Sequence, residues 1–137
     1  VDAVVLNHQA NGLMGVTYSV LLVERGRDPF KGSYALPGGF VDYDEDIEDA
    51  IHREIEEETG LSGLPFRQFR TFGKPGRDPR GHTVSVVYVA VIIGEPPEVA
   101  GGDDAASATW APISRLPELA FDHAYILGKV LETLKVD

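Results

Sequence analysis

Three glutamates near the middle of the chain, Glu54, Glu57 and Glu58, are spaced to crowd together on one side of an α-helix, where residues three and four apart are neighbours. Carboxylates that are crowded and partly shielded from water become protonated, pair with cations or coordinate a metal ion. Oxygen ligands of this kind suit Mg²⁺ or Mn²⁺. The spacing therefore predicts a divalent-cation site, and an ordinary acidic surface helix is the alternative.

The helix that carries these glutamates is expected to pack on the core through an apolar stripe. Ile47, Ala50 and Ile51 fall on one side at helical spacing, and we expect Glu54 and Glu58 to continue that stripe. The remaining polar residues are expected on the solvent side: Asp49, His52, Arg53 and Glu56. This pattern places carboxylates where apolar groups would otherwise lie.

The ends of this helix carry recognisable signals. Asp44 and Asp46 are both candidate N-caps, and Gly60 is a natural left-handed terminator. Upstream, Gly38 and Gly39 allow the backbone to approach a ligand closely, although a plain tight turn is the alternative.

Composition indicates one domain covering residues 1–137, with 43% hydrophobic and 25% charged residues. The chain has no cysteine, which excludes disulfides and thiolate metal sites. No stretch is long and apolar enough to span a bilayer, and no signal peptide is evident. We therefore expect a cytoplasmic protein that does not bind membranes.

The charge is unevenly distributed. Residues 42–58 contain ten acidic residues and one Arg, which accounts for nearly all of the net charge of −10. This argues against a nucleic-acid partner, because binding a phosphate backbone needs basic patches. By contrast, residues 67–80 hold five bases and one acid, in a segment whose second half is rich in Gly and Pro. A basic loop facing an acidic helix would bind an anionic phosphate ester with the help of bridging cations, and a solvated surface loop is the alternative.

Strand-like runs surround the acidic segment. Residues 1–6, 18–24, 64–72, 83–93 and 109–112 are predicted as strands, and residues 123–136 as a C-terminal helix with Leu127, Leu131 and Leu134 at helical spacing. Strands and two helices in this order indicate an α/β domain.

Residues 39–61 resemble the Nudix signature, G-x5-E-x7-R-E-U-x-E-E-x-G-U, where U is a bulky aliphatic residue. All nine fixed positions match: Gly39, Glu45, Arg53, Glu54, Ile55, Glu57, Glu58, Gly60 and Leu61. The resemblance implies an α/β Nudix fold, an αβα sandwich with a central mixed β-sheet and the Nudix loop-helix-loop. It also implies a hydrolase of nucleoside diphosphates linked to another moiety.

The resemblance also implies site roles. Metal ligands would be the Gly38 carbonyl, Glu54, Glu57 and Glu58, with Mg²⁺ as cofactor and Mn²⁺ as a substitute. The catalytic set would be these glutamates and Arg53, which is placed to orient Glu57 four residues on. Substrate contacts are expected from Arg25, Arg77, Asp78 and Arg80. The candidates for the general base are Glu95, Asp103 and Asp104.

Segments outside the signature resemble those of small bacterial and archaeal ADP-ribose pyrophosphatases: YALPGGFVDYDE, GRDPRGHTVSVVYVA, GGDDA and LAFDHAYIL. This implies Mg²⁺-dependent hydrolysis of ADP-ribose to AMP and ribose 5-phosphate, and a homodimer by analogy. Two alternatives remain. The substrate could be NADH, a nucleotide sugar or an oxidised nucleotide, or the chain could be a non-catalytic ADP-ribose sensor. The intact signature, and a length that leaves no room for a DNA-binding extension, favour the enzyme.

Overall fold

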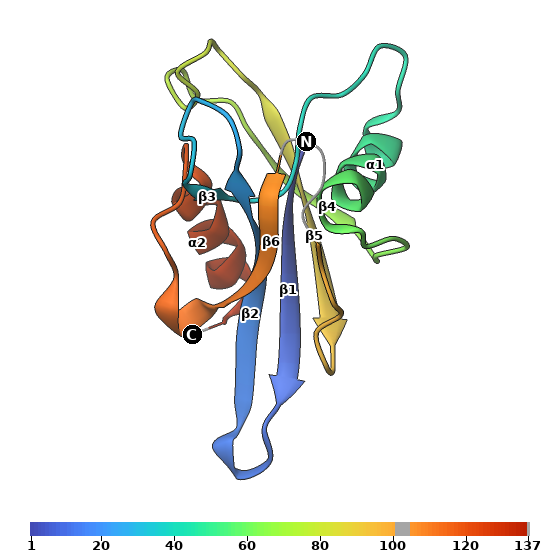
Figure 1. Ribbon diagram of the computed structural model, residues 1–137, viewed down its shortest axis with the longest axis vertical. Coiled ribbons are helices and arrows are strands. Elements are labelled where there is room, and N and C mark those ends of the chain that lie inside the picture. The colour runs from blue at the N-terminus through green and yellow to red at the C-terminus, as the bar shows by residue number, and fades with distance from the viewer. Residues whose placement is uncertain (101–104, 137) are drawn as a thin grey trace.

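The computed structural model describes residues 1–100 and 105–136, which form a six-stranded sheet between two α-helices (Figure 1). The strands are β1 (Asp2–Ala10), β2 (Val16–Arg25), β3 (Tyr34–Ala35), β4 (Arg67–Phe72), β5 (Ser85–Ile93) and β6 (Ala105–Pro112). The helices are α1 (Ile47–Thr59) and α2 (His123–Leu134), and two short 3-10 turns cover Gly12–Met14 and Ile113–Arg115. The predicted α/β sandwich is confirmed.

The sheet is mixed, with β1 at its centre. The strand order is β3-β2-β1-β5-β4. β1 and β3 pair with different parts of the same edge of β2, and β6 pairs with the opposite edge of β2. β1 runs parallel to β5, whereas the other pairs are antiparallel. Alternate residues of β1 point to opposite faces: Val4 and Leu6 pack in the core layer under α2, and Ala3 and Val5 pack in the layer under α1. A strand buried on both faces gives the site a rigid base.

The functional region is created where β1 and β2 separate. The two strands pair from Leu6 and Val20 toward their hairpin, but not beyond that point. There the segment 34–39 enters between them, so that β3 pairs with β2 and Gly38 forms a bridge with Asp2 of β1. Gly39, which opens the Nudix signature, and Gly38 before it thereby lie next to the first residues of the central strand.

The core-facing stripe of α1 differs from the prediction. Its buried residues are Ala50, Ile51, Ile55 and Thr59. Ile55 and Thr59, rather than Glu54 and Glu58, continue the stripe, because they follow Ile51 at intervals of four. Glu54 and Glu58 lie beside that stripe and face a cleft, so their carboxylates border the core without replacing it.

The structure distinguishes between the two candidate N-caps of α1, Asp44 and Asp46. Asp46 is the N-cap, and its carboxylate accepts a hydrogen bond from the backbone N–H of Glu48 at 2.9 Å. Asp44 instead occupies a turn with φ of 59°. Gly60 ends the helix in the left-handed region with φ of 80°, as predicted.

Strand boundaries depend on pairing more than on local pattern. The strand predicted over 64–72 begins at Arg67, where pairing with β5 starts, and the short edge strand predicted over 109–112 extends back to Ala105 along β2. β3 is only two residues long and has no sequence signal of its own. Within the described residues, neither helix has the length and apolar character needed to cross a membrane.

Candidate active site

A cleft of about 760 Å³ opens where β1 and β2 separate. Segments that are distant in sequence meet there: the start of β1, the end of β2, residues 38–41, α1, the loop between β4 and β5, and the start of α2. Of the predicted site residues, the cleft brings together Gly38, Glu54, Glu58, Arg25, Arg77, Asp78 and Arg80. The acidic helix and the basic loop therefore do face one shared space.

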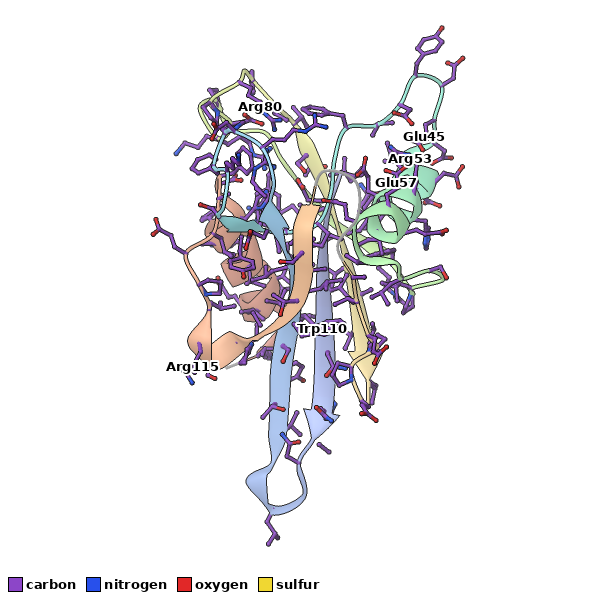
Figure 2. All side chains as sticks on the ribbon, in the orientation of Figure 1. Glu45, Arg53, Glu57, Arg80, Trp110 and Arg115 are labelled. Atoms are coloured by element: carbon purple, nitrogen blue, oxygen red, sulfur yellow. The ribbon has the colours of Figure 1, made fainter. Side chains whose placement is uncertain are left out.

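On the helix side, Arg53 organises the carboxylates (Figure 2). Its guanidinium binds Glu45 through two nitrogens at 2.7 and 2.9 Å, and its remaining donors contact Glu54 at 2.9 Å and Glu57 at 3.2 Å. It also donates to the carbonyl of Phe40 at 3.1 Å. Arg53 is predicted on the solvent side; its side chain is 26% exposed, and its guanidinium turns toward these carboxylates. The predicted contact with Glu57 is present.

This network sets the charge of its members. The Arg53 hydrogen bond, helped by the backbone N–H of Asp42, lowers the pKa of Glu45 to about 2. Glu45 is therefore ionised throughout the physiological range and fixes the Arg53 guanidinium. Partial burial raises the pKa of Glu54, although the same guanidinium opposes that effect. Glu57 is the most exposed of the three signature glutamates, with 40% of its side chain accessible.

Glu58 has the most unusual environment in the cleft. Its carboxyl accepts a hydrogen bond from the backbone N–H of Gly38 at 2.8 Å, and its side chain is half-buried beside the cleft. Burial raises its pKa to about 8, and the nearby negative charges of Glu54 and Asp2 add to that effect. A carboxyl held this way gains strongly from a cation.

These oxygen donors fit a hard divalent cation in their chemistry. Among the described residues, however, no three acidic or histidine side chains already form a closed ligand cluster. The Arg53 guanidinium contacts the carboxylates of both Glu54 and Glu57. Of the predicted ligands, Gly38, Glu54 and Glu58 line the cleft, and Glu57 is linked to Glu54 through Arg53.

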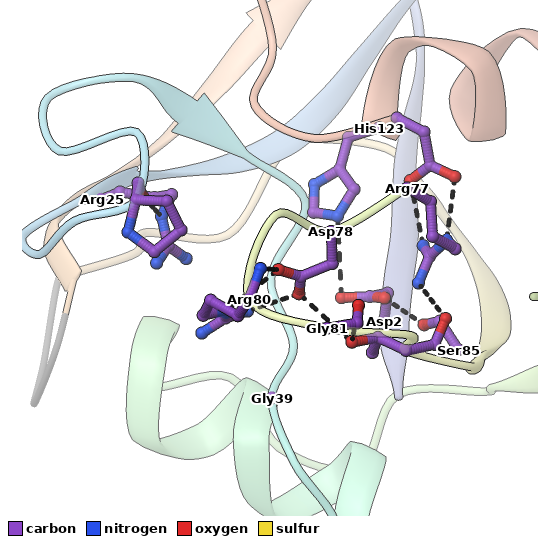
Figure 3. Close-up of polar contacts among 12 residues, drawn as sticks. Asp2, Arg25, Gly39, Arg77, Asp78, Arg80, Gly81, Ser85 and His123 are labelled. Carbon is purple, nitrogen blue, oxygen red and sulfur yellow. Dashed lines mark hydrogen bonds and ion pairs between the residues drawn. The ribbon is translucent and has the colours of Figure 1, made fainter. Parts of the chain in front are cut away.

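On the basic side, two arginines have different settings (Figure 3). Arg77 is only 5% exposed and binds both oxygens of Asp122 at 2.9 Å, and it also donates to the carbonyl of Thr83 at 3.2 Å. It lines the cleft, but its donors are engaged within the protein. Arg80 is 44% exposed and pairs with the buried Asp78 at 2.8 Å. Arg80 is the more accessible cation.

Aromatic rings surround the Arg80 guanidinium. It lies over Phe40 at 5.2 Å and over Phe121 at 5.4 Å, and Arg25 lies over the same Phe121 ring at 4.9 Å. Arg25 also donates to the carbonyl of Pro29 at 2.7 Å. Arg25 at the end of β2 and Arg80 in the loop between β4 and β5 thus contact the same Phe121 ring beside the cleft.

Replacing Arg77 with Ala is expected to lower the free energy of unfolding by about 3 kcal/mol, because it leaves the Asp122 carboxylate without its bidentate partner. Urea denaturation measures this. Arg80→Lys serves as the comparison, since it keeps a cation at an accessible position and is expected to unfold near the wild-type denaturant concentration. An unchanged unfolding midpoint for Arg77→Ala would contradict a structural role for that ion pair.

The structure describes only one of the three candidate general bases, Glu95. Glu95 follows Gly94, whose N–H donates to the carbonyl of His8, toward the end of β1 opposite Asp2. A base must reach the attacking water, so the structure does not bring Glu95 to the chemistry. Asp103 and Asp104 lie outside the described residues.

Sequence reasoning missed several residues of the cleft. Asp2, Ser85, Phe121 and His123 all line it, and Asp122 supports Arg77 from just outside. For residues 121–123 a signal did exist, because they fall within the segment LAFDHAYIL. Asp2 and Ser85 are single polar residues at strand starts, and nothing in the local sequence distinguishes them.

A model of the NUDIX domain matches residues 1–134, and the chain therefore belongs to the Nudix family. It is 44% identical over 117 residues to the ADP-ribose pyrophosphatase of Methanocaldococcus jannaschii, across 85% of this chain and 68% of the archaeal protein. Among solved structures, the NUDIX domain of Shewanella oneidensis NrtR complexed with ADP ribose is similar, with a TM-score of 0.84 and 32% identity, covering 97% of this chain and 85% of that chain.

A bifunctional NMN adenylyltransferase/ADP ribose pyrophosphatase from Francisella tularensis, complexed with AMP and a manganese ion, is also similar. Its TM-score is 0.78 at 30% identity, and the match covers 96% of this chain and 41% of that one. These similarities confirm the predicted Nudix fold and family.

Proposed function

We propose that the protein hydrolyses ADP-ribose to AMP and ribose 5-phosphate in the cleft described above. The observation that carries the proposal is the facing arrangement of the cleft, with Glu54 and Glu58 on one side and Arg25 and Arg80 on the other. The 44% identity to an archaeal ADP-ribose pyrophosphatase supports the choice of substrate. A diphosphate would be bound from both sides, by the two arginines on one side and by divalent cations held on the glutamates on the other.

Glu54, Glu57, Glu58 and the Gly38 carbonyl would hold Mg²⁺ or Mn²⁺, which would neutralise phosphate charge and acidify water. The manganese ion in the Francisella structure supports this ligand chemistry. Arg53 would keep Glu54 and Glu57 oriented, because Glu45 fixes its guanidinium. Its four contacts with carboxylates and the Phe40 carbonyl span the loop and the helix of the signature.

Arg80 and Arg25 would bind the diphosphate oxygens, and Asp78 would accept hydrogen bonds from ribose hydroxyls. In the reaction, a water oxygen forms a bond to one phosphorus while the bond from that phosphorus to the bridging oxygen breaks. The bridging oxygen leaves with the other phosphate, and the two water protons are released or taken up by the products. Arg77, which is held by Asp122, would position the loop that carries Asp78 and Arg80.

A substrate panel tests the proposal. Incubation with Mg²⁺ and ADP-ribose is expected to release AMP and ribose 5-phosphate, resolved by ion-exchange chromatography. ADP-ribose is expected to give a higher kcat/KM than NADH, GDP-mannose or an oxidised nucleotide. The Glu58→Gln variant, purified in parallel, controls for a contaminating hydrolase. A higher kcat/KM for another member of the panel would replace the proposed substrate.

One observation favours a second candidate, an ADP-ribose-sensing domain without turnover: the close similarity to the NrtR domain complexed with ADP ribose. Calorimetric titration measures binding of ADP-ribose, and analysis of the ligand after incubation shows whether it has been hydrolysed; together they distinguish the two candidates. A sensor binds ADP-ribose and leaves it intact after prolonged incubation with Mg²⁺, whereas the hydrolase converts it. The intact set of signature carboxylates supports the hydrolase.

A further inference from the structure

The floor of the cleft contains a polar cluster that the proposed chemistry does not use. It consists of Asp2, Ser85 and His123, from β1, β5 and α2 respectively (Figure 3). All three line the cleft, and Ser85 and His123 are buried. Buried polar groups are costly unless their hydrogen bonds are satisfied, so the contacts made by this cluster indicate what it stabilises.

His123 holds the backbone of the segment that precedes the signature. Its Nδ1 accepts a hydrogen bond from the backbone N–H of Leu36 at 3.0 Å in a fully buried contact. Because Nδ1 is the acceptor, the neutral ring carries its proton on Nε2. That nitrogen faces Oδ1 of Asp2 at 4.0 Å. Burial lowers the pKa of His123, in keeping with a neutral ring.

Asp2 is held from two directions. The hydroxyl of Ser85 donates to its Oδ2, and Nε2 of His123 lies 4.0 Å from its Oδ1. The backbone of Asp2 forms a bridge with Gly38, and the Ala3 N–H donates to the carbonyl of Pro37 at 2.8 Å. A Cβ atom added to Gly38 would lie 2.5 Å from Oδ1 of Asp2, so the carboxylate of Asp2 lies directly against the turn that contains Gly38.

The same turn carries groups that the proposed reaction needs. Gly38 supplies a carbonyl to the predicted ligand set, and its N–H donates to Glu58 at 2.8 Å. Beyond that contact, the segment is fixed by pairing with β1 on one side and by the His123 hydrogen bond to Leu36 on the other. A shift of this turn would move the Gly38 carbonyl and Glu58 together.

We propose that Asp2, Ser85 and His123 form a positioning unit, which sets the orientation of the Gly38 carbonyl and of Glu58 by holding the turn at residues 36–38. These residues do not touch the substrate; they act through the turn. The proposal rests on the function proposed above, and it predicts a loss of kcat and of metal affinity with little change in KM. Partners behind metal ligands typically contribute about 10- to 100-fold to affinity or activity.

Two substitutions at His123 separate positioning from packing. In His123→Asn the amide oxygen falls near the position of Nδ1 and keeps an acceptor for the Leu36 N–H. In His123→Gln it falls near Nε2, so the Leu36 N–H loses its partner. Asn leaves the larger cavity, so a purely packing role makes Asn the more damaging change. A positioning role predicts instead that His123→Gln is the more damaging substitution, because only Asn keeps an acceptor for the Leu36 N–H.

The expected result is that His123→Gln lowers kcat and the affinity for Mn²⁺, measured by electron paramagnetic resonance, by about tenfold or more, with KM within about twofold of wild type. His123→Asn is expected to stay within about threefold on each measure. Ser85→Ala, a nearly isosteric change, is expected to lower kcat and Mn²⁺ affinity between these limits. His8→Asn, toward the other end of β1, is the matched control and is expected to leave both unchanged.

A third measurement needs neither metal nor substrate. Exchange of the Leu36 and Gly38 amide protons in the metal-free protein is expected to accelerate in His123→Gln and Ser85→Ala, but not in His8→Asn. Inactive wild-type protein would overturn the proposed function, while the order of Mn²⁺ affinities and exchange rates would still decide this inference. Equal behaviour of the Asn and Gln variants, or a change confined to KM, would overturn the positioning unit.

Discussion

If Glu58 is the metal ligand proposed above, Glu58→Gln is expected to lower kcat for the proposed substrate, ADP-ribose, by roughly two to three orders of magnitude, because a direct metal ligand contributes several kcal/mol to the transition state. The fold is expected to persist, since Gln has the same shape and can still accept the hydrogen bond from Gly38. Steady-state kinetics and circular dichroism measure the two effects. Glu56→Gln, on the exposed side of α1, is the matched control and is expected to retain wild-type kcat.

The same substitution has a pH signature in the metal-free protein. The folded pKa of Glu58 is about 8, above its ordinary value of 4.5, so the folded state binds the proton more tightly than the unfolded state. The stability contributed by Glu58 is therefore fully present below pH 4.5 and is lost as pH rises to about 8, with a slope of at most about 1.4 kcal/mol per pH unit. Gln does not titrate and lacks this loss.

Urea denaturation in EDTA between pH 5 and pH 9 measures the difference between the two proteins, so that other titrating groups common to both cancel. Glu58→Gln is expected to gain stability relative to wild type as pH rises. In Mg²⁺ the order is expected to reverse at high pH, since only wild type offers an ionised ligand. Parallel stability curves in EDTA would contradict the buried, proton-binding state of Glu58.

Gly38→Ala and Gly39→Ala are expected to have different effects, although the residues are adjacent: Gly39→Ala mainly lowers activity, and Gly38→Ala mainly lowers stability. A methyl group on Gly39 would lie within 2.5 Å of the Glu54 carboxylate. That carboxylate is the end of a flexible side chain and can move, so we expect a stability loss below about 1 kcal/mol. Because the movement takes Glu54 out of its position, kcat is expected to fall by about tenfold or more.

A methyl group on Gly38 would instead meet backbone: it would lie 2.8 Å from the Cα of Asp2, against the Val1 carbonyl, and 2.5 Å from Oδ1 of Asp2. The central strand cannot move aside, so Gly38→Ala is expected to lower the free energy of unfolding by about 3 kcal/mol. Gly128→Ala in α2 is the control, because nothing lies within 4 Å of its added methyl group. It is expected to be neutral or slightly stabilising, with unchanged kcat.

Chemical denaturation and kinetics on the three variants test this contrast. The expected pattern is lost activity with retained stability at Gly39, lost stability at Gly38, and neither at Gly128. If Gly39→Ala keeps full activity, the Glu54 carboxylate does not need its present position. If Gly38→Ala is as stable as wild type, the turn is looser than its contacts with β1 indicate.

Much of the site was predictable from sequence because its chemistry is local. The spacing of Glu54, Glu57 and Glu58 along one helix determines that the three carboxylates are neighbours, whatever the helix packs against. Gly60 and Asp46 likewise mark the helix ends through their own backbone and side-chain preferences. For the same reason the signature identifies the Nudix family, which the match over residues 1–134 confirms.

Only the tertiary structure shows which side chains these site residues contact. Arg53 turns toward the carboxylates because Glu45 and the Phe40 carbonyl lie across the loop from it, and periodicity does not encode that contact. Arg77 and Asp122 are 45 residues apart in the chain, and Asp2 and Ser85 are 83 apart. Asp2 and Ser85 meet because β1 pairs in parallel with β5, and Arg77 meets Asp122 because the loop before β5 reaches the start of α2. The sequence by itself thus determined which groups can bind a cation, and strand pairing determined which groups hold them in place.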